Sequence, residues 1–302
     1  MPHDHDHRHS HAAPSHDFPF AVGVVLNLAF VAVEVFYGLA ANSLALLSDA
    51  AHNLSDVFGL LIAWSAVHLG RSLPTKRRTY GLRRSSILAA LTNAIFLLIV
   101  VGGIVWEAIG RFSLPEPVQS HTVIWVAAAG IAINSISALL FVRGRKKDLN
   151  INGAFLHMAG DAAISFGVVL GGLAILATGW DWLDPAISIL IGGAIVWSTW
   201  GLLRESLALV MDAVPAGIDS HAVETYLAAL PGVAAVHDLH IWGMSTTEVA
   251  LTAHLVMPEP PADDGLLRDV CHELRARFEI GHVTIQIEHG DIACHQAPAN
   301  VV

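Results

Sequence analysis

Six long apolar stretches constrain the fold of this chain more than any other feature of its sequence. Each is long enough to cross about 30 Å of hydrocarbon as a helix, and they lie at 18–40, 43–69, 85–110, 121–142, 153–178 and 184–203. The mean hydropathy is +0.57 and only 14% of the residues are charged, which is too apolar for a chain that is soluble throughout. The sequence therefore predicts an all-α membrane bundle of six transmembrane helices within residues 18–210.

The basic residues predict the orientation of this bundle. Segments 71–84 and 143–148 together hold ten Lys and Arg, whereas in the loops on the other side only Arg111 lies near a membrane boundary. Because basic loops stay in the cytoplasm, both termini are expected there. The expected location is the plasma (inner) membrane.

Residues 211–302 predict a separate small domain after a linker marked by Pro215 and Gly217. Hydrophobic spacing indicates an α-β-β-α-β order, with helices at 220–230 and 264–278 and strands at 233–242, 248–257 and 282–288. An antiparallel sheet with both helices on one face would bury these patterns, as in a ferredoxin-like α+β domain.

The charge and the histidines of the two flanking regions favour small cations as partners. From residue 213 onward there are 12 acidic and 3 basic residues, a formal balance of −9, which excludes a nucleic-acid-binding tail. Residues 1–17 alternate His with polar residues and predict a disordered, His-rich cytoplasmic tail that binds metal weakly. The alternative is a solvated segment without a binding role.

Ionisable residues recur with one spacing inside two of the apolar stretches. His52 and Asp56 lie in the second stretch, and His157 and Asp161 lie in the fifth. A charged side chain at the bilayer centre costs about 2.5–3.5 kcal/mol even on the lenient insertion scale, so each marks a site or a pathway. On a helix, residues four apart differ by about 40° in azimuth and about 6 Å along the axis, so both members of a pair can reach one ion.

Two such helices packed face to face would supply two imidazole nitrogens and two carboxylate oxygens. This four-ligand set matches the tetrahedral preference of Zn²⁺, and the two carboxylates neutralise its charge. For one pair alone, the alternative is a His–Asp hydrogen bond that braces the bundle, but the repetition favours a shared metal site. Asp49 lies about 10.5 Å from Asp56 along the axis, so we assign it to the access route or to the surroundings of the ligands.

Several motifs together resemble a cation diffusion facilitator of the zinc-transporter type. These are the two HxxxD pairs, the stretch SLALLSDAAHNLSDV, the loop motif RRTYG and the tail motif HDLHIW, and the resemblance runs from about Phe20 to Glu288. It implies a homodimeric divalent-metal/proton antiporter with a cytoplasmic, metallochaperone-like C-terminal domain. Zn²⁺ is then the expected substrate, protons are the counter-ion, and the transport site falls on His52, Asp56, His157 and Asp161.

The resemblance also implies a cytoplasmic metal site at His237, His254 and Glu288. Gln286 stands where some members have a further His, and Cys294 followed by His295 stands where some members end in CxxC, so these two are further candidate ligands. The alternative is that all are ordinary polar residues of strands.

Two other functional classes stay open at this point. A metal-dependent membrane enzyme fits less well, because the sequence has no HExxH motif and no Glu beside the His pairs to act as a general base. A metal-sensing channel, in which the C-terminal domain is the functional part, is the other alternative.

Overall fold

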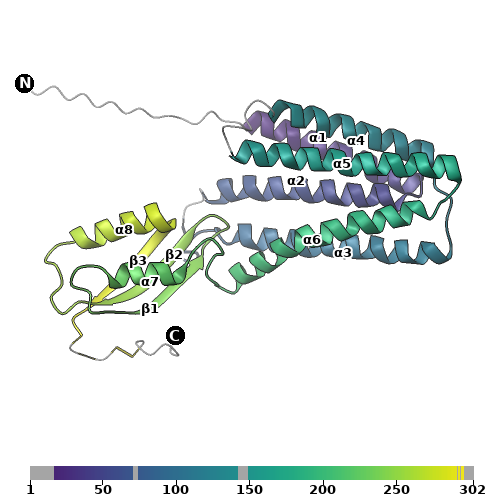
Figure 1. Ribbon diagram of the computed structural model, residues 1–302. Coiled ribbons are helices and arrows are strands. Elements are labelled where there is room, and N and C mark those ends of the chain that lie inside the picture. Colours follow the sequence, from purple (N-terminus) through teal and green to yellow (C-terminus); the bar gives the residue numbers. More distant parts are fainter. Residues whose placement is uncertain (1–16, 71–73, 142–148, 291, 293, 296–302) are drawn as a thin grey trace, which may run out of the picture. The chain divides into compact units, whose positions relative to one another are not determined.

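The computed structural model describes residues 17–70, 74–141, 149–290, 292, 294 and 295 (Figure 1). Each of the six expected apolar stretches forms a helix. The helices are α1 (Asp17–Ala40), α2 (Leu44–Gly70), α3 (Ser85–Ser113), α4 (Ser120–Phe141), α5 (Leu149–Thr178) and α6 (Leu183–Val210). Among the described residues, α3, α4, α5 and α6 are long and apolar enough to cross a membrane, and α1 contributes a shorter apolar stretch, Asn27–Ala40.

The chain divides into two compact units, and helices α2, α3 and α6 contribute to both. The first unit comprises Met1–Leu60 and Gly103–Gly192, and the second comprises Leu61–Gly102 and Gly193–Val302. In the first unit, α4 packs along α5 and against α1. Gly130 of α4 permits this approach, because a Cβ there would lie 3.0 Å from the Phe30 ring and 3.1 Å from the Ser165 hydroxyl.

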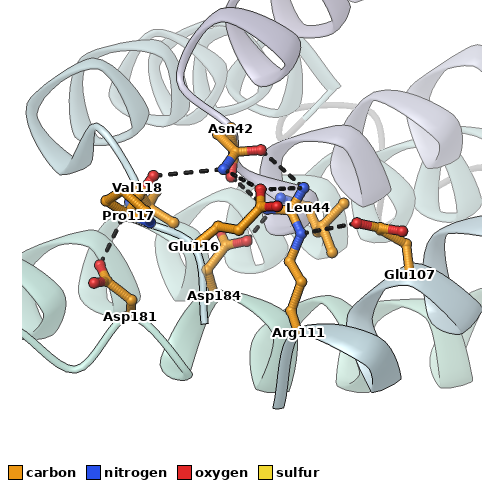
Figure 2. Close-up of polar contacts among 9 residues, drawn as sticks. All are labelled: Asn42, Leu44, Glu107, Arg111, Glu116, Pro117, Val118, Asp181 and Asp184. Carbon is orange, nitrogen blue, oxygen red and sulfur yellow. Dashed lines mark hydrogen bonds and ion pairs between the residues drawn. The ribbon is translucent and has the colours of Figure 1, made fainter. Parts of the chain in front are cut away.

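The turn between α1 and α2 is held by side chains that are distant in sequence (Figure 2). Asn42 has a left-handed backbone with φ of 56°, which asparagine tolerates better than most residues. The guanidinium of Arg111 donates to its carbonyl and side-chain oxygens, each at 2.8 Å. Asp184, at the start of α6, accepts hydrogen bonds from the Ser43 hydroxyl and from the Leu44 N–H at 2.7 Å, so it caps α2 from another helix.

The second unit contains the predicted α-β-β-α-β domain. Its elements are α7 (Ser220–Ala228), β1 (Ala235–Gly243), β2 (Val249–Val256), α8 (Gly265–Phe278) and β3 (Ile280–Glu288). Both helices cover one face of the sheet, because buried Leu227 of α7 and Leu274 of α8 share a single core with Leu251 and Leu255 of β2.

The expectation of an antiparallel sheet is wrong for one of its two strand pairs. The strand order is β1-β2-β3, with β1 antiparallel to β2 but β3 parallel to β2. Because α8 connects β2 to β3, the chain returns to the same end of the sheet before β3 starts, and such a crossover produces a parallel pair.

Candidate metal centres

The first candidate centre lies where α2 meets α5 in the first unit. The Nε2 atom of His52 is 3.0 Å from Oδ1 of Asp161 and 4.0 Å from Oδ2 of Asp56. One ligand atom from each residue can be chosen so that all three lie within 4.8 Å of one another. Ligand atoms at 2.0–2.2 Å from a tetrahedral Zn²⁺ lie roughly 3.4 Å apart, so small side-chain movements would form three zinc ligands here.

Burial strengthens the case for an ion at this position. The Asp161 side chain is only 3% exposed, and those of His52 and Asp56 are 19% and 23% exposed. Two carboxylates this close together repel each other in an environment of low dielectric constant, and a divalent cation would offset that repulsion. The i,i+4 spacing of His52 and Asp56 explains why both reach Asp161 from one face of α2.

His157, the fourth predicted ligand, lies on α5 four residues before Asp161. Its side chain lies outside the described part of the chain, so its place in the ligand set stays a prediction.

Two further carboxyl groups lie buried near this centre. Asp49 of α2 accepts a hydrogen bond from the Ser165 hydroxyl at 2.8 Å, and Glu34 of α1 accepts one from the Asn53 amide at 2.8 Å. Both side chains are fully buried. Asp49 is not among the three grouped ligands, and its assignment to the access route or to the surroundings of the ligands stays a prediction.

The second candidate centre lies on the C-terminal sheet, on the face opposite the two helices. Residues His237, His254, Glu288 and Cys294 offer ligand atoms that all lie within 4.8 Å of one another. His237 and His254 are partners in the β1–β2 register. The two Glu288 oxygens lie 3.0 Å from Nε2 of His237 and from Nδ1 of His254, and Sγ of Cys294 lies 3.7 Å from the same Nδ1.

The charge state of Glu288 suits metal binding. Burial raises the pKa of its carboxyl group, but hydrogen bonds from Cys294, His237 and Gln286 outweigh burial, so the pKa lies below the usual value. Glu288 is therefore ionised at neutral pH and available as a ligand. His295 is exposed, and this group of four does not include it.

Asp238 also lies beside this centre, although the sequence, taken as a regular strand, does not predict it. A β-bulge lies between His237 and His240, and the Asp238 backbone there is left-handed with φ of 50°. Its carboxylate oxygens lie 2.9 Å from Nε2 of His240 and 3.4 Å from Nε2 of His254. Aspartate is rare inside strands, so its presence in this strand pattern was the one sequence feature that could have indicated a bulge here.

Comparison with known proteins shows that two family models match consecutive parts of this chain. Residues 20–211 match the family model of the cation efflux transmembrane domain, and residues 215–290 match that of the cation efflux protein cytoplasmic domain.

Full-length relatives agree with this match. The cation efflux system protein CzcD of Alcaligenes is 38% identical, with 94% of this chain and 92% of the relative covered. The zinc transporter ZitB of Escherichia coli is also 38% identical, with 91% and 87% covered. A cadmium, cobalt and zinc/H(+)-K(+) antiporter of Bacillus velezensis is 34% identical, with 88% and 87% covered.

One solved structure, the metal-bound C-terminal domain of CzcD from Cupriavidus metallidurans, is 37% identical and covers 24% of this chain and 99% of its own. Its TM-score against this chain is 0.22. The family models between them span nearly all of the two units, and the relatives match along most of their own length. The chain therefore belongs to the cation efflux family, whose members are integral, multi-pass membrane transporters.

Proposed function

We propose that this protein is a Zn²⁺/H⁺ antiporter that exports zinc from the cytoplasm by alternating access. The observation that carries the proposal is the half-buried cluster of His52, Asp56 and Asp161, which come from two helices of the transmembrane domain of a cation efflux protein. The names of the relatives support zinc as the cargo and protons as a counter-ion.

The ligand set proposed for zinc consists of this cluster together with His157. Two nitrogens and two oxygens suit Zn²⁺ better than Mg²⁺ or Ca²⁺, which prefer oxygen ligands alone. Asp49 is proposed to lie on the access route or around the ligands, and not to bind the ion itself.

Proton exchange follows from the chemistry of these ligands. Imidazole must be neutral and carboxylate ionised to bind a metal, so zinc and protons compete for the same atoms. Zinc arriving from the cytoplasm displaces protons, and protons arriving from the other side displace zinc. Because the ligands come from α2 and α5, movement of these two helices would expose the site to one side at a time.

The same proposal includes the arrangement of the whole protein. Six transmembrane helices lie within residues 18–210, between a His-rich tail at 1–17 and a metallochaperone-like domain at 211–302. Both termini lie in the cytoplasm, two copies form a homodimer, and the membrane is the plasma (inner) membrane. The loop charges support the orientation.

For the C-terminal domain we propose a regulatory zinc site formed by His237, His254 and Glu288. Cys294 is a further ligand, supported by its position within the same group. His295 is the outermost candidate, and its exposed position makes its contribution the weakest.

Counter-flow in proteoliposomes tests the main proposal. Purified protein is reconstituted with a zinc-sensitive dye and a pH-sensitive dye inside the vesicles. An antiporter gives saturable zinc uptake together with movement of protons in the opposite direction. Zinc flux that does not depend on the proton gradient would indicate a channel. Chemical conversion of a substrate without zinc flux would indicate an enzyme. Either result would contradict the proposal.

A further inference from the structure

A cavity lined by four arginines lies in the second unit, where the loop after α2 enters α3. Its volume is about 450 Å³, and its lining includes Arg77, Arg78, Arg83, Arg84, Tyr80 and Trp242. This volume is within the range of sites that bind small ligands. The four guanidinium groups are thus gathered in one place in a protein whose formal net charge is −10.

Two of the four arginines are held in place by carboxylates of other elements. Arg83 Nη1 lies 2.8 Å from Oε1 of Glu248, and Arg84 pairs with Asp212. Each of these guanidinium groups has five N–H donors, so an ion pair leaves donors available for a second partner. The two pairs thus orient Arg83 and Arg84 without using up their hydrogen-bonding capacity.

The other two arginines have no carboxylate partner among the described residues. Arg77 and Arg78 are exposed and make no ion pair within the residues described by the structure. Counting the four arginines against Glu248 and Asp212, the cavity carries a formal charge of +2. An anion bound here would balance this charge.

The loop that carries the unpaired arginines has a defined shape. Thr75 and Arg78 exchange two backbone hydrogen bonds of 3.0 Å, and the Thr75 hydroxyl accepts a third at 3.1 Å. The Tyr80 ring meets the ring of His282 edge to face, with centroids 5.4 Å apart. Membrane orientation requires positive charge in cytoplasmic loops, and this explains why the loop contains arginines. Orientation does not require that the arginines line a cavity of defined shape.

The position of the cavity selects one kind of anion. Helix α3 begins at Ser85, which lines the cavity, and α3 is apolar enough to cross a membrane. Leu88, one turn further along, also lines the cavity and is 54% exposed. The cavity therefore combines guanidinium groups with an apolar side chain at the end of a membrane helix, where a lipid places its phosphate next to its acyl chains.

We propose that this cavity binds the phosphate group of an anionic phospholipid headgroup. Guanidinium groups bind phosphate oxygens through paired N–H donors, which lysine cannot do in the same geometry. The proposal concerns lipid binding alone, so it can succeed or fail whether or not the protein exchanges zinc for protons.

Native mass spectrometry of the detergent-solubilised full chain tests this directly. Dioleoylphosphatidylglycerol and dioleoylphosphatidylcholine are titrated separately into the wild type, into R77Q/R78Q and into R268Q/R275Q. The last variant removes two exposed charges from α8 and serves as the matched control. We expect the wild type and the control to bind phosphatidylglycerol in preference to phosphatidylcholine, and R77Q/R78Q to lose about tenfold in affinity for phosphatidylglycerol.

Three results would overturn the proposal. The first is unchanged phosphatidylglycerol affinity in R77Q/R78Q, and the second is an equal loss in the control. The third is displacement of the lipid by millimolar inorganic phosphate, which would make free phosphate the ligand.

If R77Q/R78Q fails to insert or fold, R77K/R78K takes its place, because it keeps the loop charge that sets orientation. We expect it to bind phosphatidylglycerol several-fold more weakly than the wild type. Equal affinity in the lysine variant would contradict recognition by the guanidinium groups.

Discussion

At the scale of single residues, Asp161 has the most demanding environment of the three grouped ligands. It is almost fully buried, it lies 3.0 Å from His52, and it comes from a different helix than the other two. Among the described side chains, Asp161 is the ligand that α5 contributes to this group.

We expect Asp161→Asn to abolish zinc uptake into proteoliposomes while the protein stays folded. The amide keeps the shape of the side chain, but it loses the negative charge and is a poor zinc ligand. Asp49→Asn is the matched control, because Asp49 is equally buried but hydrogen-bonds Ser165 and is not among the grouped ligands. Uptake at the wild-type rate in Asp161→Asn, or equal loss in both variants, would contradict the proposed ligand set.

His52→Asp tests whether ligand chemistry sets metal selectivity. The substitution replaces a nitrogen ligand with an oxygen ligand, so the site should accept Mn²⁺ or Cd²⁺ at the expense of its preference for zinc. Competition between metals for uptake into vesicles measures the change. His254→Asp makes the same replacement in the C-terminal centre and should leave the transport preference as it was; an unchanged profile in both variants would place selectivity elsewhere.

At the scale of elements, helices and strands are tied together by contacts that bridge long stretches of sequence. Asp184 caps α2 from the start of α6, and Arg111 of α3 holds the turn between α1 and α2 (Figure 2). All of these contacts lie within the first unit, where they join the ends of α1, α2, α3 and α6.

We expect Asp184→Ala to lower the thermal unfolding midpoint of the detergent-solubilised protein by several degrees. The substitution leaves the Leu44 N–H and the buried Ser43 hydroxyl without their acceptor, which costs about 1–3 kcal/mol for an unsatisfied buried group. Asp181→Ala is the control, because among the described residues the Asp181 carboxylate accepts a single long hydrogen bond, of 3.4 Å, from the Val118 N–H. A midpoint shift no larger than that of the control would show that the cap contributes little.

At the scale of the whole molecule, charge is distributed very unevenly along the chain. The segment from residue 213 onward has a formal charge near −9, so two copies brought together in a homodimer repel each other. Zinc bound at the centre formed by His237, His254 and Glu288 would reduce that repulsion.

We therefore expect zinc to shorten the distance between the two C-terminal domains of a dimer. Spin labels placed on α8 of both copies, measured by pulsed electron resonance with and without zinc, report that distance. Moderate salt should weaken the effect, because it screens charges separated by more than about 8–10 Å. The protein must also be shown to bind zinc at this centre. If it binds zinc and the distance distribution does not change, the proposed regulatory movement is contradicted.

Local patterns in the sequence determined much of this protein. The lengths of the apolar stretches predicted six helices, and the change of hydrophobic period from 3.6 to 2 predicted the order of helices and strands after residue 211. The i,i+4 spacing placed His52 beside Asp56 on one face of α2, because such neighbours are set by helix geometry alone. In each case, residues close in sequence decide the outcome.

Only the tertiary structure decided which distant groups meet. It brought Asp161 to His52 across 109 residues and Asp184 to Ser43 across 141 residues, and it paired β3 in parallel with β2. It also turned Asp238 toward His254 through a bulge that a regular alternation does not contain. These features depend on how whole elements pack and on where the chain crosses over, and local spacing carries no information about either.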